Sequence, residues 1–231
     1  RLRRPGRRGI KVLASAAIVA LAATGFIGFL HTSAGRPLLA RLGVGCPVKR
    51  VTPAQAEALR QRGVGALRGA TPAPARPALG MRLDDSTEAD VVAWATQNGV
   101  ACKSVLLGLR QLQCANVPAA ALGSPAGGPV NELIFAFNPA GRLISVDVLR
   151  AGLSPANAAV IFAQQTGALR AALGTAPVQV GDPSPAYLGS GPLRTVLASY
   201  RYADYLASVT AMAMPSGVSV RAQYQSATRV Q

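Results

Sequence analysis

The pattern of hydrophobic and polar positions divides the chain into one long apolar segment and a series of short periodic ones. Residues 12–30 form a run of nineteen residues without a charge. At about 1.5 Å per residue, a helix of this length spans about 28 Å, close to the roughly 30 Å hydrocarbon core of a bilayer. Cleaved signal peptides have a shorter apolar region, of roughly 7–15 residues. The sequence therefore predicts a retained transmembrane anchor.

Short segments of helical and alternating periodicity follow from residue 78 onward. Two main helices are expected, one capped by Ser86 or Thr87 and running to about residue 98, and one from Ser154 to about residue 173, each followed by a glycine. Asp90, three residues after Thr87, resembles the second member of a capping box. Strands are expected at 79–83, 105–109, 111–115, 133–137, 143–149, 195–202 and 218–224. Several strands between two helices favour an α+β fold with an antiparallel sheet over a parallel doubly wound one.

The region between the anchor and this domain contains one short helix and a linker. Thr52-Pro53 is a typical helix start, and Gly63 and Gly65 are expected to end that helix near Arg62. Residues 69–77 are rich in proline and alanine, which predicts an extended, semi-rigid linker. The chain is thus expected to have three parts: an anchor with its basic flank at 1–31, a basic juxtamembrane segment at 32–77, and an α+β domain at 78–231.

Charge next to the anchor predicts its orientation. Residues 1–11 hold six basic residues, whereas the basic residues beyond the anchor are spread over a longer stretch. The positive-inside rule therefore favours a cytoplasmic N-terminus in the inner membrane and a periplasmic C-terminal domain. Small residues four apart share one face of the anchor and would let another membrane helix approach closely. These are Ala16, Ala20, Thr24 and Gly28.

The formal net charge of +15 does not indicate a nucleic-acid-binding domain once its distribution is considered. Residues 83–231 carry nine basic and eight acidic side chains, so the excess lies in and next to the anchor. This placement favours anionic lipid headgroups or an acidic protein partner. The juxtamembrane residues expected to make such contacts are Arg36, Arg41, Lys49 and Arg50.

The three cysteines leave two alternatives open. Cys102 and Cys114 bracket a short apolar segment, and in an extracytoplasmic domain a disulfide between them would close that loop. Two unpaired, buried thiols are the alternative. Cys46 lies too far beyond the apolar segment for a lipoprotein site, so we expect a packed thiol.

No set of residues in the sequence indicates catalysis, a metal or a cofactor. The single histidine, His31, lies at the predicted membrane boundary, which excludes most nucleophile–histidine arrangements and histidine-based zinc sites. Four acidic residues between Asp84 and Asp90 are explained by the helix dipole at a helix start. Tyr200, Tyr202 and Tyr205 are a candidate partner interface, because tyrosine is enriched in interfaces, with ordinary strand packing as the alternative.

Residues 31–39 and Gly45-Cys46-Pro47-Val48 resemble uncharacterised single-pass envelope proteins of high-GC Gram-negative bacteria. That resemblance implies neither an activity nor catalytic residues. The architecture is also similar to that of accessory subunits of photosynthetic or respiratory membrane complexes.

These features predict a non-enzymatic accessory or scaffold subunit that contacts other integral membrane subunits. A reaction centre–light-harvesting assembly is the particular complex that we expect. The alternative is a membrane-tethered periplasmic binding or chaperone-like domain, which predicts a ligand pocket between sheet and helices. No nucleic acid and no identified small-molecule substrate are among the expected partners.

Overall fold

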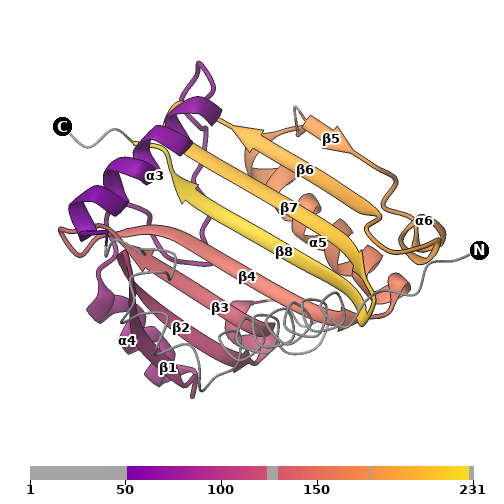
Figure 1. Cartoon of the computed structure of the whole chain (residues 1–231), viewed down its shortest axis with the longest axis horizontal. Helices are drawn as coiled ribbons and strands as arrows, with labels where there is room; N and C mark the ends of the chain where they lie inside the picture. The colour runs from indigo at the N-terminus through magenta and orange to yellow at the C-terminus, as the bar shows by residue number, and fades with distance from the viewer. Residues whose placement is uncertain (1–50, 124–129, 177, 229–231) are drawn as a thin grey trace, which may run out of the picture. The chain divides into compact units, whose positions relative to one another are not determined.

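An eight-stranded antiparallel sheet, in the order β1-β2-β3-β4-β8-β7-β6-β5, is the centre of the structure (Figure 1). The computed structural model describes residues 51–123, 130–176 and 178–228. The strands are β1 Cys102–Leu107, β2 Leu109–Val117, β3 Val130–Phe137, β4 Leu143–Leu153, β5 Val178–Val180, β6 Thr195–Arg201, β7 Tyr205–Met214 and β8 Gly217–Ser226. The helices are α3 Pro53–Leu67, α4 Glu88–Gln97, α5 Pro155–Leu173, α6 Pro185–Gly189 and the 3-10 helix η1 Ala119–Leu122. The α+β class with an antiparallel sheet is therefore confirmed.

The order of elements repeats one plan twice: a helix followed by a four-stranded antiparallel meander. Helix α4 precedes β1–β4, and α5 precedes β5–β8. The two halves join where β4 pairs with β8, in a register that places Asp147 opposite Gln223. This pairing joins strands that are far apart in the chain. The continuous eight-stranded sheet therefore requires both halves.

Local sequence explains where α4 and α5 begin. The side chain of Thr87 accepts a hydrogen bond from the Asp90 amide, and the Asp90 carboxylate accepts one from the Thr87 amide, which completes the expected capping box. Ser154 caps α5 in the same way by accepting from the Asn157 amide. Both helices end close to the expected residues.

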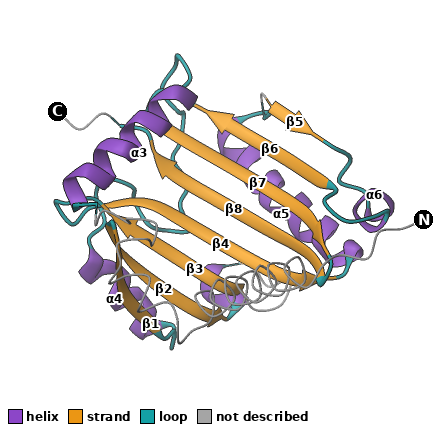
Figure 2. Cartoon of the chain, viewed as in Figure 1, coloured by secondary structure: helices purple, strands orange, loops and turns teal. Residues whose placement is uncertain are grey.

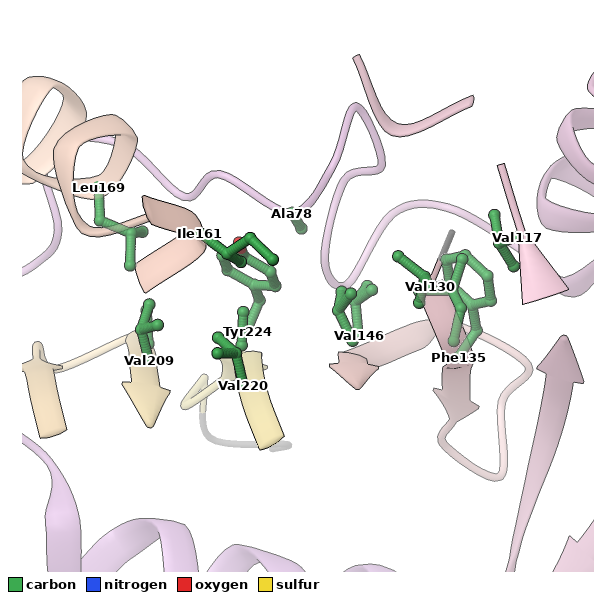
Figure 3. Packing of buried hydrophobic residues seen from close by; sticks show 14 of the residues in the cluster. Ala78, Val117, Val130, Phe135, Val146, Ile161, Leu169, Val209, Val220 and Tyr224 are labelled. Atoms are coloured by element: carbon green, nitrogen blue, oxygen red, sulfur yellow. The ribbon is translucent and has the colours of Figure 1, made fainter. Parts of the chain in front are cut away.

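The main hydrophobic core lies between α5 and the sheet face on which α5 packs. Figure 3 shows Ile161 and Leu169 of α5 pointing toward Val209, Val220 and Tyr224 of the sheet. Val160 and Ala168 of α5 are exposed. The residues of α5 that are buried are Ala158, Ile161, Phe162, Thr166, Leu169 and Leu173.

Helix α3 packs on the opposite face of the sheet, across one end of the strands (Figure 2). Val64 lies against Leu206 and Ala227, and Ala56 lies in the cluster that contains Ile144. The helix continues past Gly63 and Gly65 to Leu67, so the expected end at Arg62 is wrong.

The segment that we expected to be a free linker, residues 69–77, is bound to the sheet. The Gly69 amide donates to the Tyr202 carbonyl oxygen at 3.2 Å, and the Ala73 amide donates to the Asp204 carboxylate at 2.8 Å. The buried Tyr205 hydroxyl donates to the Pro77 carbonyl oxygen at 2.6 Å. Residues from Val51 onward accordingly form one compact unit, and the boundary expected at residue 78 is not seen.

Three further differences concern strands. Residues 79–83 form turns, with Leu79 and Gly80 at positive φ, instead of the expected strand. Strand β5 and helix α6, which lie within residues 178–192, are not among the expected elements. Strand β7 was not expected at all, although it pairs with β6 and β8 at the centre of the second meander.

None of the helices in the described part of the chain has both the length and the apolar character needed to cross a bilayer. The predicted anchor at 12–30, the small-residue stripe and the juxtamembrane arginines and lysines of 36–50 lie outside the described residues.

Candidate functional site

The face of the sheet opposite α5 is the most extensive candidate site in the described residues. Side chains of successive strands line up on it in rows, because each strand pairs in register with the next. One row consists of Ile134, Asp147, Gln223, Ser208 and Ser199. The next row consists of Glu132, Leu149, Arg221, Thr210 and Leu197. We call these ten residues the open face.

The open face is partly accessible and chemically mixed. Nine of its residues are half-buried and Arg221 is exposed, while the residues between them on the same strands point into the core. Among the described residues, α3 is the helix that packs on this side, and it covers the strand ends. A sheet face that only meets water alternates apolar-in with polar-out. Here Ile134, Leu149 and Leu197 stand among the outward-facing polar groups.

A hydrogen-bonded carboxylate lies at the centre of the open face. Asp147 accepts from the Arg221 guanidinium, at 2.8 Å between Nε and Oδ1, and from the Gln223 amide at 3.0 Å. This hydrogen bond to Asp147 raises the pKa of Arg221 above its ordinary value. Asp147, Arg221 and Gln223 connect the neighbouring strands β4 and β8. Their hydrogen bonds hold these side chains in place without a bound partner.

A concavity of about 170 Å³ adjoins the open face beneath the end of α3. Leu67 forms one wall, and Ser199, Ser208, Gln223 and Gln225 line it with hydroxyl and amide groups. These neutral donors and acceptors, with the charged side chain of Arg201 that also lines the concavity, suit a polar protein surface.

Most carboxylates elsewhere in the described residues are held by arginines or by helix caps, and Asp182 accepts from the amide and hydroxyl of Ser184. Glu57 pairs with Arg60 at 2.7 Å, and Glu88 pairs with Arg110 at 3.3 Å. No group of three or more potential metal ligands occurs within the described residues. Of the acidic residues considered above, Asp84 accepts from Arg76, Ser226 and Thr228, and Asp90 caps α4.

Asp84 predicts a particular pH dependence of stability. Burial raises its pKa, but the hydrogen bonds from Arg76, Ser226 and Thr228 outweigh that effect, so the net pKa is below the ordinary value. A carboxylate with a lowered folded-state pKa contributes stability that is complete above its unfolded pKa, roughly pH 4, and is lost as pH falls through the folded pKa. Asp84→Asn, which tolerates the positive φ of this position, removes that contribution.

We therefore expect Asp84→Asn to lower the melting temperature at pH 7 and to lose less stability than the wild type between pH 7 and pH 3. Thermal unfolding at the two pH values measures both quantities. Asp85→Asn is the control, because Asp85 forms only an exposed ion pair with Arg82. Equal losses in wild type and Asp84→Asn would contradict the assignment.

The tyrosines predicted as a partner interface lie largely inside the protein. Tyr200 and Tyr205 are 1% and 0% exposed, and Tyr202 is half-buried with its hydroxyl donating to the Leu173 carbonyl oxygen. The interface prediction is wrong for Tyr200 and Tyr205, because their strands turn these positions toward α5 and the 69–78 segment. Strand packing, the alternative, accounts for them.

The two cysteines considered for a disulfide are bonded. Cys102 and Cys114 lie directly opposite each other in the β1–β2 ladder, with their Cα atoms 4.1 Å apart. The spacing of the two cysteines in the sequence did not decide between a disulfide and two unpaired thiols. The tight turn at Gly108 brings the two positions into register.

The open face itself was not foreseen. Its residues come from five strands whose order depends on the β4–β8 pairing, and only the alternation within each strand was visible in the sequence. No protein-family model matches the chain, and no curated protein or solved structure matches it either. Within the described residues, the fold is an α+β domain whose sheet packs against α5 on one face and against α3, at the strand ends, on the other.

Proposed function

We propose that the chain is a non-enzymatic accessory subunit that holds a folded protein partner on its open face. Its N-terminal segment anchors it beside the other subunits of a membrane complex. The observation that carries this proposal is the open face, a mixed polar and apolar surface on which, among the described residues, α3 is the helix that packs, over the strand ends.

The size of the surface is compatible with part of a protein interface. The open face covers five strands, which at a spacing of about 4.8 Å span about 19 Å, and the part of β8 that α3 leaves free extends over about 20 Å. The product, about 400 Å², is about half of the roughly 800 Å² that each partner buries in a stable protein–protein interface, so adjoining residues would have to supply the rest. A small ligand would leave most of this area exposed.

The chemistry of the surface supports the same partner class. Leu149 and Leu197 supply apolar contact, and Ser199, Ser208 and Gln223 supply neutral hydrogen-bonding groups, a mixture typical of non-obligate interfaces. Because β-strands hold these side chains in fixed rows, little conformational entropy is lost when a partner binds.

The disulfide supports the proposed location of the domain. Structural disulfides persist in oxidising compartments such as the periplasm and are rare in the cytosol. The Cys102–Cys114 bond therefore fits a domain on the periplasmic side of the inner membrane. A reaction centre–light-harvesting assembly is the complex to test first.

Purification of the full chain from its native membrane in mild detergent tests the proposal. We expect larger membrane subunits to co-purify in fixed stoichiometry, and Ser208→Arg to reduce their recovery at least tenfold. Ser208 lies at the centre of the open face, so an arginine there would stand between the two surfaces. Ser104→Arg is the matched control, because Ser104 is exposed on edge strand β1 away from the open face.

Two results would contradict the proposal. One is a wild-type chain that migrates alone in several mild detergents. The other is a Ser208→Arg variant that folds like the wild type, as checked by thermal unfolding, and still recovers the complex in full.

A further inference from the structure

A cavity of about 240 Å³ lies on the other side of the sheet, between α5 and the edge formed by β5 and β6. Phe162 and Gly167 of α5 line one side, and Val196 and Tyr200 of β6 line the other. The binding-domain alternative predicted a pocket between sheet and helices, and this cavity has that position. It is somewhat smaller than the roughly 300–1,000 Å³ of most ligand pockets, so it suits a small molecule.

Gly167 lines this cavity from a helical position where glycine is unfavourable. It lies in the middle of α5, where glycine is less favourable than alanine by about 1 kcal/mol. A Cβ atom built on Gly167 would have no atom within 4 Å apart from the backbone of its own helix. Packing against the rest of the described protein therefore does not require a glycine here, and a larger side chain at this position would enter open space beside the cavity.

The polar groups around the cavity favour an anionic ligand. Arg170 lines it, is exposed, and forms no ion pair with any described residue. No acidic side chain is among the described residues that line the cavity. The Thr166 hydroxyl is already used, since it donates to the Phe162 carbonyl oxygen at 2.8 Å. Arg170 is therefore the charged group that remains available to a ligand.

The positively charged Arg170 lies near Tyr200, which belongs to the apolar interior. Its ring is buried between sheet and helix. Burial raises the pKa of Tyr200, and the nearby Arg170 guanidinium opposes that rise. The Arg170 guanidinium thus lies close to the buried Tyr200 ring. In a ligand with an alkyl chain and a carboxylate, the alkyl chain would contact the ring while the carboxylate contacts Arg170.

We propose that this cavity binds a small amphiphilic carboxylate, with its alkyl chain between Phe162 and Val196 and its carboxylate at Arg170. The site differs from the open face, because it lies between α5 and the β5–β6 edge and shares with the open face only Leu197. It is independent of the accessory-subunit function.

Photo-crosslinking tests the site in the full chain reconstituted into nanodiscs of zwitterionic phospholipid. The probe is decanoate with a photoreactive diazirine at the end of its alkyl chain, and mass spectrometry locates the label. We expect labelled peptides from α5 and β6, and competition by unlabelled decanoate but much weaker competition by decanol. Gly167→Leu should reduce the labelling at least tenfold, because its side chain would occupy the cavity.

Matched variants separate the site from partition of the probe into lipid. Gly167→Ala adds one methyl group and should label within about twofold of wild type. Arg170→Gln should weaken labelling by up to about fivefold, the range of an exposed ion pair, whereas Arg62→Gln on α3 should not change it. The proposal is overturned if a folded Gly167→Leu labels like wild type, or if decanol and decanoate compete equally. Because Ser208→Arg does not touch this cavity, loss of partner binding and loss of labelling are distinguishable.

Discussion

Replacement of both Cys102 and Cys114 by alanine is expected to lower the free energy of unfolding by about 3 kcal/mol. The bond closes a loop across a sequence separation of 12, and loop-closure entropy in the unfolded chain gives about this magnitude. For a unit of this size the melting temperature should fall by about 6–12 °C. Thermal unfolding of the full chain, with and without reductant, measures the change.

The disulfide holds a strand that is stabilised little by burial of apolar side chains. Strand β1 is an edge strand that pairs only with β2, and its Leu106 and Leu107 are 66% and 64% exposed. Little apolar burial therefore holds β1 in place. Hydrogen exchange in the double variant should be accelerated most in β1 and least in the β4–β8 pair at the centre of the sheet.

Reductant supplies the control for this prediction. It should lower the melting temperature of the wild type toward that of the double variant and leave the double variant unchanged. A wild type that is insensitive to reductant under conditions that break the bond would contradict the stabilising role assigned to it.

The elements that local sequence predicts well are those with their own start and stop signals. Thr87 and Ser154 cap their helices through hydrogen bonds within four residues, so neither depends on the rest of the fold. The hairpin of β3 and β4 has the turn sequence Asn138-Pro139-Ala140-Gly141 between two apolar strands. Such local signals are present in the sequence whatever the tertiary structure becomes.

Strand β7 shows where local signals are insufficient. Its residues alternate, but three of its six buried positions are alanines, namely Ala207, Ala211 and Ala213. Alanine has low β-propensity, and only the neighbouring strands β6 and β8 make these small side chains suitable. The open face depends on the same long-range pairing, so the sequence contains its residues without showing that they are neighbours.

The segment at 69–77 misled the prediction for a different reason. Its composition is typical of an exposed linker, yet the turn between β6 and β7 provides matching partners for its backbone. Tyr202 and Asp204 accept from its amides, and the Ala203 amide donates to the Thr71 carbonyl oxygen. Composition alone cannot distinguish a free extended segment from one that is docked through its backbone.

Gly69 provides the decisive test of that docking. A Cβ atom on Gly69 would overlap the Arg201 carbonyl oxygen, so Gly69→Ala must displace either this segment or the end of β6. We expect a destabilisation of about 2–3 kcal/mol, and thus a fall in melting temperature of about 4–12 °C. Gly65→Ala is the matched control, since a Cβ there meets no atom within 4 Å and should stabilise α3 by about 0.5–1 kcal/mol. A free linker would make Gly69→Ala neutral, so opposite signs for the two substitutions can arise only if residues 69–77 are part of the folded domain.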